Sequence, residues 1–245
     1  MKHNIYLVGM GPGKEEMMTG EALKALEAAD VIIGYTVYIK LLGERFADKE
    51  MRTTPMRQEE ERCKLCFEEA KKGKQVAMVC SGDAGIYGMA SLLYEMGKEY
   101  PDTEIFVIPG ITAACSGAAV LGAPLNHDFC VISLSDLLTP WEKIEKRLLA
   151  AAGGDFAIAI YNPSSHKRKD YLKKACDILL RVIEEERPCG YVENIGREGT
   201  KAVTCTLREL RDTQVNMFTT VFIGNSDTEL ILSLIHISEP TRQEA

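Results

Sequence analysis

Three glycine-rich segments in the first half of the sequence carry residue types that could hold a small ligand. They are residues 9–13 (GMGPG), 80–88 (CSGDAGIYG) and 108–114 (IPGITAA), and each follows a short apolar run. Glycine permits positive φ and lets the backbone approach a ligand closely. Asp83 adds a carboxylate that could accept hydrogen bonds from a ribose or an ammonium group, or could cap a helix beginning near Gly85. Because ligands bind beyond the carboxyl ends of strands in open α/β sheets, three such loops in one half of the chain predict a binding site.

The first loop does not fit the two commonest nucleotide-binding patterns. A dinucleotide fingerprint needs a third glycine where Lys14 stands, and Pro12 removes one backbone N–H from the phosphate cradle. Asp30 stands roughly 20 residues further on, as that fingerprint requires, but it precedes the apolar run 31–33 instead of ending it. A P-loop fails as well, since no Gly-Lys-Ser/Thr stands at the right spacing. A tight turn without a ligand stays open for this loop taken alone.

Strands and helices must position these loops, and the apolar pattern predicts both. Apolar runs typical of strands occur at residues 4–8, 31–33, 76–80, 104–108, 129–134, 156–161, 190–193 and 219–223. Segments with helical periodicity occur at residues 15–29, 59–72, 86–99, 141–152 and 167–186. The alternation predicts an α/β fold with a mostly parallel sheet covered by helices. The continuously apolar run 156–160 fits a strand that is buried on both faces.

The composition is that of a globular protein without a basic surface. The chain has 245 residues, of which 46% are hydrophobic, and a net charge of −7. These values exclude whole-chain disorder and argue against a nucleic-acid partner. No run approaches the roughly 20 apolar residues that cross a bilayer, so we expect no membrane partner and a cytoplasmic protein. The eight cysteines are expected to be free thiols, and Cys63 and Cys66 lie in a predicted helix with no second pair to complete a zinc site, so no metal is expected.

Glycine and proline at residues 122–124 mark the best domain boundary. We expect two α/β domains, residues 1–121 and 122–231, with a cleft between them. Residues 232–245 follow no pattern set up earlier and look more like translated adapter or vector sequence than a native terminus. We therefore leave this tail out of the functional interpretation and expect it to be peripheral and expendable.

The three loops, in this order and spacing, resemble the tetrapyrrole (corrin/porphyrin) methyltransferase family over roughly residues 3 to 228. The shared motifs are GMGPG at 9–13, MTGEAL at 18–23, SGDAGIYG at 81–88 and PGITAA at 109–114. Four further stretches resemble the precorrin-3B C17-methyltransferase branch: GAPLNHDF at 122–129, SLSDLLTPW at 133–141, YNPSS at 161–165 with Lys167 and Arg168, and VENIGREG at 192–199.

The resemblance implies S-adenosylmethionine as cofactor, held between two α/β domains and not by a Rossmann-type methyltransferase fold. Matched residue by residue, the cofactor positions are Pro12, Ser81, Gly82, Asp83, Ile86, Thr112, Ala113, Asn162, Ile195 and Thr220. Thr112 could instead cap the next helix. Ala84 stands where the branch has proline, which should not alter the backbone groups that bind the cofactor.

The implied reaction is methylation at C17 of precorrin-3B or cobalt-precorrin-3, with contraction of the ring. The sulfonium methyl is already activated, so the protein has to align the reacting atoms and exclude water. Ring contraction needs proton transfers at an oxygen substituent. The candidate acids and bases are His127, Asp128, Ser133, Asp136 and Glu193. A loop histidine is more often structural than catalytic, and Asp136 could simply start the helix that contains Trp141.

A substrate with many carboxylates requires positive charge near its site. The candidate cations are Arg52, Arg57, Lys167, Arg168 and Arg197, although a solvated surface role is the alternative for each. The resemblance also implies a homodimer.

Other functions stay open beside this one. Another tetrapyrrole methylase of the same fold, such as a uroporphyrinogen-III or other precorrin methylase, or a diphthamide-type protein methylase would share the loops. In a nucleotide-binding oxidoreductase the same loops would bind a nucleotide cofactor, and in a non-catalytic binding module they would bind a ligand without turnover. Whether the substrate already holds cobalt is also left open.

Overall fold

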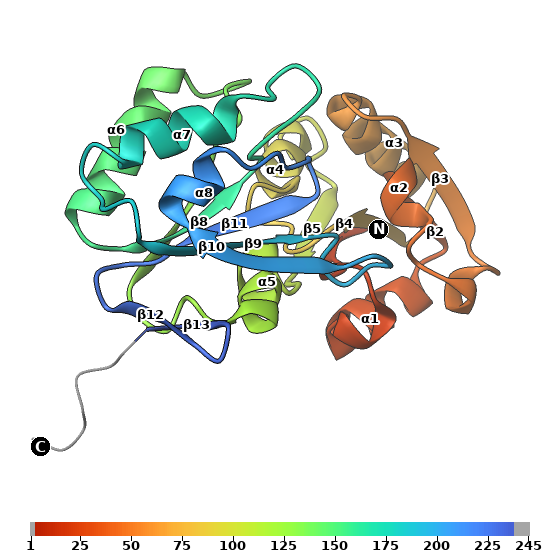
Figure 1. The fold of residues 1–245 in the computed structure, drawn as a ribbon. Helices are drawn as coiled ribbons and strands as arrows, with labels where there is room; N and C mark the ends of the chain where they lie inside the picture. Colours follow the sequence, from red (N-terminus) through yellow and green to blue (C-terminus); the bar gives the residue numbers. More distant parts are fainter. Residues whose placement is uncertain (1–2, 238–245) are drawn as a thin grey trace, which may run out of the picture. The chain divides into compact units, whose positions relative to one another are not determined.

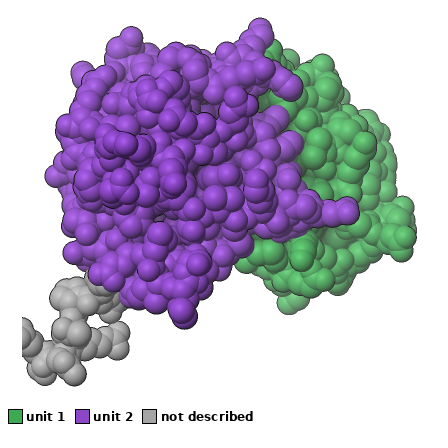
Figure 2. Space-filling view, viewed as in Figure 1, with its two compact units in different colours: residues 1–113 green, residues 114–245 purple. Residues whose placement is uncertain are grey.

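The computed structural model describes residues 3–237, and residues 1–2 and 238–245 lie outside the described part. The chain forms two compact units, unit 1 up to Ala113 and unit 2 from Ala114, which Figure 2 colours green and purple. The sequence boundary after Leu121 differs, because helix α5 (Ala113–Leu121) is grouped with unit 2. Within residues 3–237, no helix has both the length and the apolar character needed to cross a membrane.

Unit 1 is a parallel sheet covered by helices on both faces (Figure 1). Its strands, in the order β3-β2-β4-β1-β5, are β1 (His3–Gly9), β2 (Val31–Tyr35), β3 (Glu50–Thr54), β4 (Val76–Cys80) and β5 (Thr103–Ile108). Its helices are α1 (Gly20–Ala28), α2 (Thr36–Ile39), α3 (Glu59–Lys71) and α4 (Ala90–Gly97), with short 3-10 helices at Glu15–Met17 and Glu44–Phe46. This unit confirms the predicted parallel α/β arrangement.

Two apolar clusters hold the sheet of unit 1, one on each face. Alternate strand residues such as Val8 and Ile32 pack with Leu26 of α1. Their neighbours, including Ile33, pack with Phe67 of α3 on the other face. All five side chains are fully buried, as the period-two alternation of a strand between two helical layers requires.

Unit 2 contains a second five-stranded sheet, in the order β10-β9-β11-β8-β7. Its strands are β7 (Phe129–Ser133), β8 (Ala157–Tyr161), β9 (Pro188–Glu193), β10 (Lys201–Thr206) and β11 (Thr219–Ile223), and its helices after α5 are α6 (Trp141–Gly153), α7 (Tyr171–Leu179) and α8 (Leu207–Arg211). Residues 157–160 of β8 are fully buried, as predicted, but Phe156, which belongs to the same apolar run, precedes the strand and is exposed.

The expectation of a mostly parallel sheet is wrong for unit 2. In its five-stranded sheet only β7 and β8 pair in parallel, whereas β8–β11, β11–β9 and β9–β10 pair antiparallel. The short turn 194–200 joins β9 directly to β10, and strands joined by so short a connection must run antiparallel.

A three-stranded sheet completes unit 2 and includes part of the tail. Strands β12 (Thr228–Ile231) and β13 (Leu234–Ile237) form a hairpin, and β13 pairs in parallel with β6 (Gly122–Ala123). Ile235 and Ile237 are fully buried, so this portion of the tail packs against unit 2 and differs from the peripheral segment expected. Residues 238–245 of the tail lie outside the described residues.

Candidate functional site

The three glycine loops of unit 1 lie side by side at the carboxyl end of its sheet. They follow β1, β4 and β5, which are adjacent and parallel. Gly11 and Gly82 bridge the first two loops through reciprocal backbone hydrogen bonds: Gly11 N donates to Gly82 O at 3.1 Å and Gly82 N to Gly11 O at 2.7 Å. The loops therefore form one continuous backbone surface instead of three separate turns.

Close packing of backbone explains why glycine is required in these loops. A Cβ added to Gly110 would lie 2.2 Å from Gly82 O and 2.5 Å from Gly9 O, which no side chain tolerates. Gly82 itself has φ +68°, a conformation that side chains other than glycine seldom adopt.

Asp83 connects the second loop to the third. Its Oδ1 accepts a hydrogen bond from Gly85 N at 2.8 Å, and its Oδ2 accepts one from Gly110 N at 3.0 Å. Helix α4 begins only at Ala90, with Met89 at its N-cap, so Asp83 does not cap it and the capping alternative is wrong. The helix predicted from residue 86 starts later because Tyr87 has φ +52°.

The unit 1 positions assigned to the cofactor lie on this loop surface. A Cβ on Gly82 would lie 3.6 Å from the Thr112 Cα and 3.8 Å from the Ala113 N, which brings the second and third loops together. Pro12 is buried, whereas Ile86 is exposed. The glycines let the backbones of the three loops pack against one another, and the N–H groups of Gly11, Gly82 and Gly110 are used in hydrogen bonds between the loops.

In unit 2, the remaining positions gather at one end of the sheet. Since β8 and β9 both run opposite to β11, the carboxyl ends of β7, β8 and β9 meet the amino end of β11. The Nδ2 of Asn162 donates to the Ser133 Oγ at 2.9 Å, which ties the residue after β8 to the last residue of β7. At the same end, Glu193 pairs with Thr219 in the sheet, Thr220 is buried in β11, and Ile195 is buried in the turn after β9.

Asp136 belongs to a side-chain cluster that the sequence did not predict. Its carboxylate forms an ion pair with Arg168 and accepts a hydrogen bond from the Tyr171 hydroxyl at 2.6 Å. The Tyr171 hydrogen bond, assisted by the Arg168 guanidinium, lowers the pKa of Asp136 against the cost of desolvation, and the same bond raises the pKa of Tyr171. Asp136 is thus held ionised, which does not suit a proton donor.

His127 and Asp128 lie away from the other acid–base candidates. Both are exposed and precede Phe129, the first residue of β7, whereas Ser133 is its last. A strand of this length separates its two ends by about 13 Å. The structure therefore groups Ser133, Asp136 and Glu193 at one end of the sheet and leaves His127 and Asp128 at the other.

The predicted cations have different surroundings. Arg52 pairs with Glu50 at 2.7 Å and with the buried Glu69 at 2.9 Å. Hydrogen bonds from Lys72 and Lys74, with the Arg52 charge, lower the pKa of Glu69 to about 2. Because Glu50 is the first residue of β3, this network lies at the amino end of the unit 1 sheet, opposite the loops.

The other cations lie in loops that follow strands. Arg57, with φ +67°, is exposed in the turn after β3. Lys167 is exposed in the loop after β8, next to Arg168. The guanidinium of Arg197 lies 5.2 Å from the centre of the Phe218 ring, in the turn after β9.

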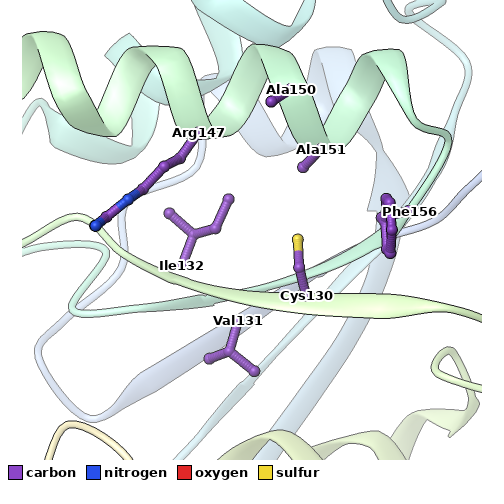
Figure 3. Close-up of a pocket in the computed structure, with 7 residues that line it drawn as sticks. All are labelled: Cys130, Val131, Ile132, Arg147, Ala150, Ala151 and Phe156. Atoms are coloured by element: carbon purple, nitrogen blue, oxygen red, sulfur yellow. The ribbon is translucent and has the colours of Figure 1, made fainter.

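A shallow pocket of about 330 Å³ lies between β7 and α6 of unit 2 (Figure 3). Cys130 and Ile132 point toward the helix and Val131 points away from it. The remaining lining residues are Arg147, Ala150, Ala151 and Phe156. None of the positions predicted from the sequence lines it.

Cys63 and Cys66 are buried in α3, where the sequence predicted them to be ordinary helix residues. Burial raises the pKa of Cys63 to about 12 and also raises the pKa of Cys66, so both stay protonated thiols. Among residues 3–237, no three His, Cys, Asp or Glu side chains gather as a metal site would need.

Comparison with known proteins assigns the loops to a family. The family described as Tetrapyrrole (Corrin/Porphyrin) Methylases matches residues 4–211. The chain belongs to the tetrapyrrole methylase family. A relative from Salmonella typhimurium, named probable cobalt-factor III C(17)-methyltransferase, is 45% identical over 91% of this chain and 92% of its own length. The chain spans 50% and 43% of two further, longer relatives.

Solved tetrapyrrole methylases share the fold. The crystal structure of the methyltransferase CobJ superimposes with a TM-score of 0.89 and 36% identity, covering 96% of this chain and all of that one. Uroporphyrin-III C-methyltransferase from Thermus thermophilus, complexed with S-adenosylhomocysteine, has a TM-score of 0.71 at 20% identity, covering 90% of this chain and 97% of its own. The fold is that of the tetrapyrrole methylases, as the resemblance implied.

Proposed function

We propose that this tetrapyrrole methylase transfers the methyl group of S-adenosylmethionine to C17 of a corrin precursor and supports contraction of the ring. The meeting of three glycine loops, at the family's motif positions, on one edge of the unit 1 sheet carries the proposal. The name of the Salmonella relative favours the cobalt-containing substrate, cobalt-factor III or cobalt-precorrin-3. Metal-free precorrin-3B is the other substrate that the sequence leaves open.

The cofactor would be held by the backbone of the three loops together with the unit 2 positions. When bound, S-adenosylmethionine supplies an activated sulfonium methyl group. Gly82, Thr112 and Ala113 lie close together, and Asp83 fixes the spacing between the second and third loops. Asn162, Ile195 and Thr220 lie at one end of the unit 2 sheet.

Two of the acid–base candidates fit the proposed reaction. Ser133 and Glu193 lie at the same end of the unit 2 sheet as Asn162, within the region that would face a substrate. We therefore propose one of them for the proton transfers of ring contraction. His127 and Asp128 are left out because they lie at the other end of β7.

Transfer of a labelled methyl group tests the proposal. The purified protein is incubated without oxygen with methyl-labelled S-adenosylmethionine and, in parallel, with cobalt-factor III, precorrin-3B or uroporphyrinogen III. Label in a ring-contracted product from the cobalt substrate is expected. Label in uroporphyrinogen III alone would favour the other methylase, and absence of label from every macrocycle would overturn the proposal.

Thermal stabilisation separates the proposed cofactor from a nicotinamide cofactor. A ligand at 100 times its Kd adds about 2.7 kcal/mol to the free energy of unfolding. S-adenosylhomocysteine should therefore raise the melting temperature clearly and NADPH should not. The reverse result would support the oxidoreductase alternative.

We also propose a cytoplasmic homodimer, on the family resemblance alone. Sedimentation equilibrium over a range of protein concentrations tests the dimer. A single species of about 27 kDa at every concentration would contradict it.

A further inference from the structure

Two adjacent leucines stand exposed in the loop that follows β7 of unit 2. The Leu137 side chain is 66% exposed and Leu138 is 98% exposed. A single exposed leucine is ordinary on a protein surface, whereas adjacent exposed apolar side chains form a contiguous patch, the kind of surface that marks interaction sites. Whether the loop is anchored therefore decides what the pair means.

The loop is anchored on both sides of the leucines. On one side, Leu134 is fully buried and its N donates to Tyr161 O at 2.9 Å. On the other side, Pro140 leads into helix α6. The Trp141 ring packs on the Tyr171 ring with centroids 4.7 Å apart.

Asp136 fixes the loop directly before the two leucines. Its carboxylate binds Arg168 and the Tyr171 hydroxyl, which come from the loop after β8 and from the start of α7. The Arg168 guanidinium also lies 5.8 Å from the centre of the Tyr171 ring. Asp136, Arg168 and Tyr171, which come from three segments, thus hold the backbone at residue 136.

The location of the two leucines indicates which molecule they contact. The loop leaves the carboxyl end of β7 at Ser133, whose Oγ accepts the hydrogen bond from Asn162. The leucines are therefore continuous with the unit 2 end of the proposed site, and the exposed Lys167 lies next to Arg168. A tetrapyrrole has broad apolar ring faces and carboxylates at its rim, which matches leucine side chains with a nearby cation.

We infer that Leu137 and Leu138 contact the apolar face of the tetrapyrrole substrate, and that Asp136, Arg168 and Tyr171 are positioning residues that hold them there. The inference rests on the proposed function and adds substrate-contact residues to it. It also changes two roles expected from the sequence. Asp136 positions the loop instead of transferring a proton, and the Arg168 guanidinium binds Asp136 instead of a substrate carboxylate.

The double variant Leu137→Ser/Leu138→Ser tests the contact. The matched control is Val182→Ser/Leu232→Ser, since those side chains are 58% and 93% exposed elsewhere in unit 2. Macrocycle binding is followed by quenching of Trp141, the single tryptophan of the chain. Without the leucines, we expect the Kd of the macrocycle and the KM to rise about 10- to 100-fold. The affinity for S-adenosylhomocysteine should not change, and the control should behave as wild type.

Three outcomes would overturn the inference or separate it from the proposed function. An unchanged macrocycle Kd in the double variant, with active wild-type protein, overturns the inference alone. Dissociation of a dimer in the double variant, with an unchanged Kd, assigns the leucines to an interface between copies and also overturns it. Failure of the wild-type protein to methylate any macrocycle overturns the proposed function instead.

Tyr171→Phe and Asp136→Asn test the positioning role. Phe keeps the ring that packs on Trp141 and loses only the hydroxyl bond to Asp136. Loss of one such bond should raise the KM about 3- to 10-fold, while kcat falls less. The melting temperature is measured alongside. A lower melting temperature with an unchanged KM would show a purely structural cluster and contradict the positioning role.

Discussion

The sheet ends that carry the proposed site residues are built differently in the two units. In unit 1, the carboxyl end is built from backbone: Gly9, Gly82 and Gly110 pack so closely that a Cβ at Gly110 would lie 2.2 Å from a carbonyl oxygen. In unit 2, the corresponding end is built from side chains, such as the Asn162–Ser133 hydrogen bond and the Asp136 cluster.

The difference indicates how the two ends can vary. A backbone surface presents the same N–H and C=O groups whatever the neighbouring side chains are, so a replacement such as Ala84 leaves it intact. A side-chain surface changes with each substitution. Backbone therefore suits a constant cofactor, and side chains suit a substrate that differs between members of one family.

The largest effect is expected from Gly110→Ala, which attacks the backbone surface. The new Cβ would clash with the Gly82 and Gly9 carbonyl oxygens, so the loops must separate. We expect a loss of about 3 kcal/mol or more in the free energy of unfolding, measured with urea, and loss of S-adenosylhomocysteine binding. The control is Gly20→Ala, because no atom lies within 4 Å of a Cβ there. Wild-type stability of Gly110→Ala would refute the backbone account.

The second-largest loss of stability is expected from Glu69→Gln, at the amino end of the same sheet. The folded pKa of about 2 lies below the usual value near 4.3 in an unfolded chain. The ionised group therefore stabilises the fold above about pH 4.3, and this stability is lost as the pH falls toward 2.

Three cations would lose a buried partner in Glu69→Gln, but they are partly exposed, so we expect a loss of about 1–3 kcal/mol at pH 7. The difference from wild type should narrow below about pH 4.3, and cofactor affinity should stay unchanged. Glu95→Gln, at an exposed position of α4, is the control. Weaker cofactor binding would show that the two ends of the unit 1 sheet are not independent.

The third effect is expected from Asp83→Asn, which tests the one side chain that connects the backbone loops. An amide offers a single acceptor oxygen, so either Gly85 N or Gly110 N loses its partner. We expect a loss of about 1–2 kcal/mol in stability and a roughly 10-fold rise in the Kd of S-adenosylhomocysteine. Both are measured, by urea unfolding and titration calorimetry, against the exposed-site control Asp48→Asn. If Asp83→Asn bound S-adenosylhomocysteine as tightly as wild type, the glycines alone would set the loop spacing.

The smallest effect on stability and cofactor binding is expected from Ser133→Ala on the side-chain surface. The Asn162 Nδ2 and the Ser135 N would lose their acceptor, but Asn162 is exposed, so water can replace the hydroxyl at its amide, and Ser135 is half-buried. We expect a Kd for S-adenosylhomocysteine about 2- to 10-fold higher and little change in melting temperature. A collapse of stability comparable to Gly110→Ala would contradict the proposed difference between the two ends.

Much of the fold could be predicted from the sequence because buried strands and amphipathic helices have clear periods. Strands β1, β4, β8 and β11 lie where their apolar runs predicted them. Strands β3 and β10 were missed because exposed polar residues such as Glu50 and Lys201 weaken the apolar pattern of these two edge strands. The direction of the unit 2 strands was also mispredicted. Two strands show the same apolar runs whether a short turn joins them antiparallel or a crossover helix joins them in parallel.

The sequence by itself determined the glycine loops and the family, because glycine at a position of close backbone approach is visible as a residue type. The tertiary structure alone decided which side chains meet. In the fold, Tyr171 and Arg168 bind Asp136, and Arg52 forms an ion pair with Glu69. His127 lies before the start of β7, away from Ser133 at its end. Each outcome depends on strand order and register between residues far apart in the chain, and local spacing carries no record of either.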